Sequence, residues 1–95
     1  MRLFIGSLEV IITIPCNESL KGKRRVVKSL LDRIRHRYNV GVAEVGYLDS
    51  YSLSALGVAT VSSDKQLLQQ VLEDVLKWIE HNHDGDVASY NIRIV

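Results

Sequence analysis

The sequence of 95 residues predicts a single α+β domain, 1–95, in which two helices cover one face of a four-stranded antiparallel sheet. Two segments carry apolar residues at helical spacing, and four others alternate apolar and polar residues with the period of a strand. They follow one another in the order strand, helix, strand, strand, helix, strand. This order is typical of the ferredoxin-like βαββαβ sandwich. Because strand–helix–strand crossovers are right-handed, we expect the strand order 4-1-3-2 with both helices on the same face.

The alternating pattern of residues 3–14, LFIGSLEVIITI, predicts the first strand, and Pro15 ends it. One parity of this strand is apolar and is expected to face the helices. The other parity includes Ile5 and Ile11 and lies on the open face of the sheet. Apolar side chains on an open sheet face indicate a contact surface, so we expect Ile5 and Ile11 to belong to a homo-oligomer interface.

The clearest helix of the chain runs from Ser19 to Tyr38. Ser19 suits the N-cap because its hydroxyl can accept a hydrogen bond from a free backbone N–H of the first turn. Gly22 cannot complete a capping box, and Asn39 and Gly41 favour the end of the helix. The apolar stripe of this helix consists of Val26, Val27, Leu30, Leu31, Ile34 and Tyr38.

The second half of the chain predicts a hairpin, a helix and a last strand. Segments 40–47 and 53–61 are expected to pair through a turn at residues 48–50. The candidates for the N-cap of the second helix are Ser62, Ser63 and Asp64. After a break at residues 81–85, residues 86–95 alternate again. The apolar parity of this last strand consists of Ala88, Tyr90, Ile92 and Ile94.

The net charge of +1 conceals an uneven distribution. Residues 1–40 carry nine Lys or Arg against three acidic residues, whereas residues 41–95 carry three against eight. Much of the basic excess falls on one arc of the first helix, which suits the phosphates of RNA. The predicted nucleic-acid contacts are Lys21, Lys23, Arg24, Arg25, Lys28 and Arg35. The alternative is that this helix face is merely solvated.

Glu44 is the one acidic residue in the apolar second strand. It shares parity with Val40 and Val42, which we expect to face the helices, while Lys23 lies on the apolar side of the first helix. Since a partly buried carboxylate needs a partner, we expect Glu44 and Lys23 to form an ion pair. The alternative is that Glu44 lies on the open face. The free N–H groups of the helix N-terminus, with Lys21 and Lys23, also form the best candidate anion site. The alternative is an ordinary capped helix with solvated lysines.

The sequence contains no recognisable catalytic constellation. Cys16 is the single cysteine, so an internal disulfide is excluded; we interpret it as an ordinary thiol in a reducing, cytoplasmic compartment. His81 and His83 are two residues apart, which does not place both on one helix face, and we expect no metal site. No apolar run is long enough to cross a membrane. We therefore expect no enzymatic activity and no cofactor, and identify no small-molecule substrate. The alternative is an enzyme or small-ligand protein of unknown chemistry.

Two functions known for this fold lack their residues here. Acyl-phosphate hydrolases cradle phosphate with a glycine-rich loop and an arginine after the first strand, whereas residues 14–18 of this chain read IPCNE. RNA-recognition motifs stack bases on aromatic residues of the central strands, and segment 53–61 contains none. Any RNA is therefore expected to contact the basic helix through its phosphates.

The run SLKGKRRVVKSL at residues 19–30 is similar to the signature of the YlxP-like family of small bacterial proteins of unknown function. Segments 42–45, 57–59 and 61–64 also resemble later parts of that family, so that the resemblance covers essentially the whole chain. Members commonly carry Glu at the position of Gly22, and often Trp at that of Tyr51.

The resemblance implies a ferredoxin-like fold and supplies no catalytic residues. The genes of this family often lie near genes for translation initiation and ribosome maturation, which implies RNA or ribosomal partners. We therefore expect a non-enzymatic RNA- or ribosome-associated protein that acts through its basic helix. The alternative is a homo-oligomeric interaction module without a nucleic-acid role.

Overall fold

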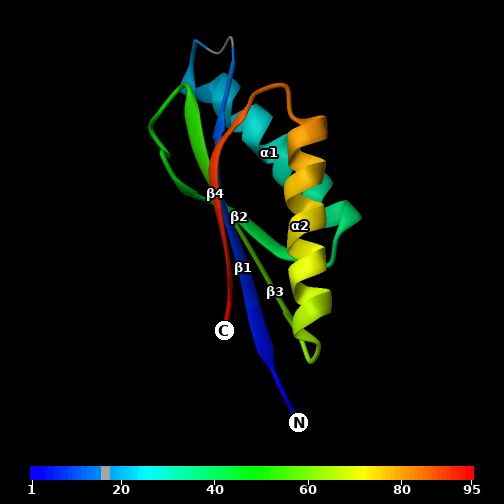
Figure 1. The fold of residues 1–95 in the computed structure, drawn as a ribbon. Helices are drawn as coiled ribbons and strands as arrows, with labels where there is room; N and C mark the ends of the chain where they lie inside the picture. Colours follow the sequence, from blue (N-terminus) through cyan, green and yellow to red (C-terminus); the bar gives the residue numbers. More distant parts are fainter. Residues whose placement is uncertain (16–17) are drawn as a thin grey trace.

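A computed structural model describes residues 1–15 and 18–95, which form four strands and two helices (Figure 1). The elements are β1 (Phe4–Thr13), α1 (Leu20–Arg37), β2 (Gly41–Gly46), β3 (Leu53–Ser62), α2 (Lys65–Asn82) and β4 (Val87–Ile94). The interpretation of Cys16 as an ordinary thiol concerns a residue outside the described ranges.

The sheet has the order β2-β3-β1-β4, and every neighbouring pair is antiparallel. Both helices lie on the same side of this sheet (Figure 1). The prediction of a ferredoxin-like βαββαβ sandwich is therefore confirmed, with β1 between β3 and β4. This arrangement leaves the second face of the sheet uncovered by either helix.

The hydrophobic core lies between the sheet and the helices. Leu8, Val10 and Ile12 of β1 have no exposed surface, as their parity predicts. From the helices, the buried apolar side chains are Val27, Leu30, Ile34, Leu68, Leu72, Val75, Leu76 and Ile79. The spacing of three and four residues along each helix explains why one stripe of each reaches the sheet.

Side-chain caps define where both helices begin. The backbone N–H of Gly22 donates to the hydroxyl of Ser19 over 3.0 Å. At α2 the choice among three candidates falls on Asp64, whose carboxylate accepts from the N–H groups of Gln66 and Leu67. A carboxylate at a helix N-terminus also interacts favourably with the helix dipole.

The last strand differs from the prediction because it contains a bulge. Ser89 pairs with Ile11 but Val87 pairs with Ile12, so Ala88 is an extra residue on β4. The bulge changes the parity, and Val87 rather than Ala88 packs against the core. Tyr90 lies beyond the bulge and is 59% exposed at this edge of the sheet.

Candidate nucleic-acid interface

The basic side chains of α1 point in three directions, because successive residues of a helix are rotated by about 100°. Lys23 points toward the sheet and has no exposed surface. A second set is exposed on a separate arc of the helix and is called here the outer basic face: Lys21, Arg24, Arg25, Lys28 and Arg35. A third set, Arg33 and Arg37, lies on the side toward α2.

Lys23 belongs to a buried polar network. Its Nζ atom lies 2.7 Å from Oε2 of Glu44 and donates over 2.6 Å to the carbonyl oxygen of Tyr47. The hydroxyl of Ser54 donates to the same Oε2 over 2.6 Å. The ion pair expected from the sequence is thus present. The placement of Lys23 among the nucleic-acid contacts is wrong, because its ammonium group is enclosed and already bound.

Because Lys23 belongs to this network, it is not available to the candidate anion site at the N-terminus of α1. The N–H groups of Gly22 and Lys23 are bound to the side chain and the carbonyl of Ser19. Lys23 is turned inward, so of the two lysines expected at this site Lys21 is the one that stays exposed. The candidate anion site thus has fewer free groups than the sequence suggests, and the terminus is that of a capped helix.

On the outer basic face, one carboxylate holds two of the cations. Asp32 lies 2.9 Å from Nζ of Lys28 and 3.2 Å from Nη1 of Arg35, and Arg35 also donates to the carbonyl oxygen of Val42. The hydrogen bond from Lys28, assisted by the charges of Lys28 and Arg35, holds the pKa of the Asp32 carboxyl below its ordinary value. Within residues 1–15 and 18–95, none of the ion pairs involves the remaining cations of this face, Lys21, Arg24 and Arg25.

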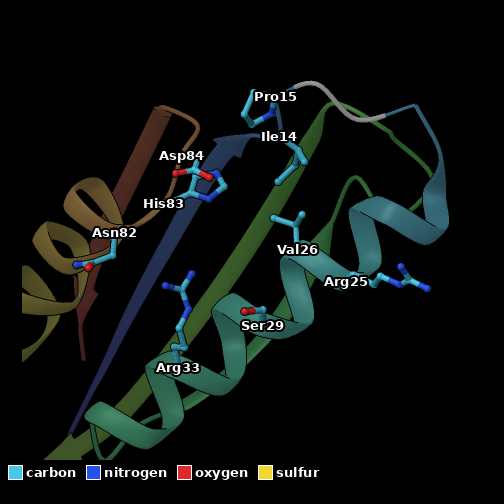
Figure 2. A pocket seen from close by; sticks show the side chains of 9 residues that line it. All are labelled: Ile14, Pro15, Arg25, Val26, Ser29, Arg33, Asn82, His83 and Asp84. Carbon is cyan, nitrogen blue, oxygen red and sulfur yellow. The ribbon is translucent and has the colours of Figure 1, made fainter.

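A groove of about 360 Å³ lies between α1 and the segment that follows α2 (Figure 2). Its lining residues are Ile14, Pro15, Arg25, Val26, Ser29, Arg33, Asn82, His83 and Asp84. In Figure 2 the side chain of Arg33 points into the space between α1 and this segment, whereas that of Arg25 points away from it. Arg33 is therefore the cation that faces the groove.

A second hollow of about 440 Å³ adjoins the first, because Arg33 lines both. Its lining residues are Asp32, Arg33, His36, Arg37 and Trp78. The guanidinium carbon of Arg33 lies 5.3 Å from the ring centroid of Trp78, which is a cation–π contact. Sequence reasoning missed this group. The available signal was Arg33 and Arg37 at a spacing of four residues, which places both on the side of α1 next to the apolar stripe.

The two histidines considered as metal ligands have other contacts. The Nε2 atom of His83 lies 2.7 Å from the carbonyl oxygen of Thr13, and the Nδ1 atom of His81 lies 2.7 Å from that of Lys77. Among the described residues, no group of three or more His, Cys, Asp or Glu side chains is placed to hold a metal ion. In the same ranges, neither helix is long and apolar enough to cross a membrane.

The open face of the sheet carries the two isoleucines proposed for an oligomer interface. Ile5 is 45% exposed and pairs across the strands with Val61, which is 60% exposed. Ile11 is partly buried and pairs with Ala55. Near them Val45 is 59% exposed, and its side chain lies against Gly57. The β1–β4 side of the same face is polar, because Ser7 and Glu9 of β1 pair with Arg93 and Asn91 of β4.

The fold and this charge distribution define a small ferredoxin-like α+β protein with a basic outer helix. Residues 5–92 match the model of a protein family of unknown function, DUF503, and the chain belongs to that family. It is 39% identical over 62 residues to the uncharacterized protein YlxP of Bacillus subtilis (strain 168), covering 65% of this chain and 67% of that protein. Its fold is similar to that of the de novo designed protein Foldit4, with a TM-score of 0.56 at 14% identity, over 99% of this chain and 97% of the other.

Proposed function

We propose that this protein is a non-enzymatic, cytoplasmic RNA- or ribosome-associated protein that binds the phosphate backbone through the outer basic face of α1. The observation that carries the proposal is that three cations, Lys21, Arg24 and Arg25, are available to bind an anion. They are exposed on one helix and make no ion pair within the described residues. A set of uncompensated cations on a rigid element is suited to phosphate contacts.

The predicted binding is electrostatic and indifferent to base sequence. Lys28 and Arg35 can add to the three free cations, although both share the carboxylate of Asp32. Neutralising about three to five phosphates gives a slope of roughly −2 to −4 for log affinity against log salt concentration. RNA affinity should therefore fall steeply as salt is added.

The test is fluorescence anisotropy of a labelled RNA against the parent protein and two triple variants. Arg24→Ala, Arg25→Ala, Lys28→Ala removes three charges from the outer basic face. The matched control, Lys65→Ala, Lys77→Ala, Arg93→Ala, removes three exposed charges from α2 and β4. We expect the first variant to lose most of the affinity and the second to retain most of it. Equal binding by the parent and the first variant would end the proposal.

The second candidate function, a homo-oligomeric interaction module, is favoured by the open sheet face. Ile5, Val45 and Val61 are each between 45% and 60% exposed on that face. Exposed apolar side chains on an uncovered sheet face are typical of a protein–protein contact. The two candidates use opposite faces of the molecule, so both can hold in the same protein.

A further inference from the structure

The side of α1 that faces α2 carries a cation–π pair formed by an arginine of α1 and a tryptophan of α2. Trp78 is partly buried and packs against the hydrophobic core, which holds its ring in place. The guanidinium group of Arg33 lies over this ring, 5.3 Å from its centroid, and the Arg33 side chain is exposed. Both side chains also line the hollow between the helices, so the guanidinium group is covered by the ring and open to that hollow. We call this pair the Arg33–Trp78 stack.

We propose that the Arg33–Trp78 stack binds an unpaired base of a single-stranded RNA segment that lies along the groove between α1 and α2. The inference rests on the proposed function and extends it by naming the form of RNA. Unpaired bases stack on arginine planes and on aromatic rings, and such stacking tolerates any base because each has a π face. The bases of a duplex are already stacked and paired, so a duplex cannot use this surface.

The charges around the stack suit the phosphates that flank such a base. Arg37 is exposed and lines the same hollow beside the imidazole ring of His36, and Arg25 lines the adjoining groove with its side chain turned away from it. From Arg25 to Arg37 the helix advances by about 18 Å, which leaves space for a short stretch of strand. Two carboxylates also line these hollows. Asp32 is bound to Lys28 and Arg35 on the outer basic face, and Asp84 lies at the far end.

The open sheet face offers no comparable surface for bases. The aromatic residues of the described strands are Phe4 of β1 and Tyr90 of β4, and both lie on the parity of the core-facing residue Val10 rather than on the open face. RNA-recognition motifs use that face for stacking. Here the ring that can support a base is on the helical side, next to the outer basic face. A strand held there can contact both surfaces of α1.

Trp78 is the single tryptophan of the chain, so its fluorescence reports directly on the groove. The experiment titrates the protein with a short oligouridylate and with an RNA duplex of the same length, and follows both Trp78 emission and anisotropy of the labelled RNA. We expect the single strand to change the emission and the duplex to leave it unchanged. Polyglutamate serves as an anionic polymer without bases and should also leave the emission unchanged.

The decisive variant is Arg33→Lys, which keeps the charge and removes the planar group. We expect it to weaken binding of the single strand by roughly tenfold without a change in the salt slope or in duplex binding. Arg93→Lys makes the same exchange at an exposed position of β4, outside both surfaces of α1, and should leave the affinity within about twofold. Circular dichroism of both variants checks that the fold is retained.

The outcomes separate this inference from the function on which it rests. If Arg33→Lys binds the single strand as the parent does, or if Trp78 emission does not respond at saturation, the stack does not bind a base and the inference is overturned. The proposed function then still stands, provided that the triple variant of the outer basic face loses binding. A response to polyglutamate equal to that of RNA would assign the groove to an acidic peptide and would also overturn the inference. Absence of binding to either RNA by the parent would overturn both proposals.

Discussion

The Nζ atom of Lys23 lies 2.7 Å from Oε2 of Glu44, in a place where Lys23 has no exposed surface and the Glu44 side chain is 15% exposed. The same carboxylate oxygen accepts from Ser54, and the ammonium group donates to the carbonyl of Tyr47. Tyr47 has a φ angle of 57°, in the left-handed region that residues other than glycine seldom adopt. The network therefore joins the first turn of α1 to the hairpin between β2 and β3.

The first prediction is that Glu44→Ala destabilises the fold far more than Glu9→Ala. Removing Glu44 leaves the ammonium group of Lys23 buried without a counter-charge, which typically costs about 3–5 kcal/mol. Glu9 is exposed on the open face, and its removal should change the free energy of unfolding by less than about 0.5 kcal/mol. Urea unfolding of both variants measures the difference.

A second substitution tests the assigned cause. Adding Lys23→Met to Glu44→Ala removes the stranded charge and should recover part of the lost stability. Equal stability of the Glu44→Ala and Glu9→Ala variants would show that the pair contributes little. A double variant less stable than Glu44→Ala alone would show that the cost does not come from a buried charge.

The meeting of Lys23 and Glu44 can largely be predicted from the sequence by simple geometry. Strand parity places Glu44 beside Val42, and rotation along the helix places Lys23 beside Val27, so their meeting follows from the two periodicities. The same rules cannot show that Lys23 loses all exposure, because burial depends on how closely β2 approaches α1. Periodicity alone therefore keeps Lys23 among the predicted phosphate contacts, although the residue is buried in the structure.

Other features depend on positions that no local pattern encodes. The contact of Arg33 with Trp78 joins residues 45 positions apart and requires the relative placement of two helices. The bulge at Ala88 changes the parity of a strand whose sequence alternates regularly. Periodicity predicts which residues share a face, but tertiary packing decides which faces meet.

We predict that Gly85→Ala is destabilising, by about 1–3 kcal/mol. A Cβ atom at this position would overlap the carbonyl oxygen of Thr13 and lie 2.7 Å from Nε2 of His83. Since His83 and Thr13 already contact each other, the backbone between α2 and β4 would have to move. Gly41→Ala is the matched control, because its nearest neighbour would be the oxygen of Ala59 at an ordinary 3.7 Å. Thermal unfolding measures both variants. If Gly85→Ala and Gly41→Ala both unfold at the midpoint temperature of the parent, the steric argument is wrong.

We predict that the parent protein self-associates and that Ile5→Lys, Val61→Lys abolishes the association. These residues pair across β1 and β3 on the open face, and two added charges would repel a second copy. Sedimentation velocity at increasing concentration measures the change. Val26→Lys places a charge on an apolar side chain of the helical side, 39% exposed, and should not alter the association. A parent that remains monomeric at high concentration would rule out this interface.

The last prediction concerns Asp32, the carboxylate that restrains two cations of the outer basic face. Asp32→Asn keeps the size of the side chain and releases Lys28 and Arg35 for phosphate contacts. We expect RNA affinity to rise several-fold at low salt and the salt slope to steepen by roughly 1, the value for about one further phosphate. A slope equal to that of the parent would show that Asp32 does not compete with RNA for these cations.

Protonation of Asp32 at low pH should remove the same negative charge as Asp32→Asn does, which can be followed through the stability of the fold. The pKa of Asp32 in the folded protein lies below the ordinary 3.8, because Lys28 and Arg35 favour the charged form. The carboxylate therefore stabilises the fold above that ordinary value, and this contribution is lost as the pH falls through the lower folded pKa. Asp32→Asn lacks this component at every pH. The stability difference between parent and variant should thus shrink as the pH falls through that range, and a constant difference would contradict the assigned role of Asp32.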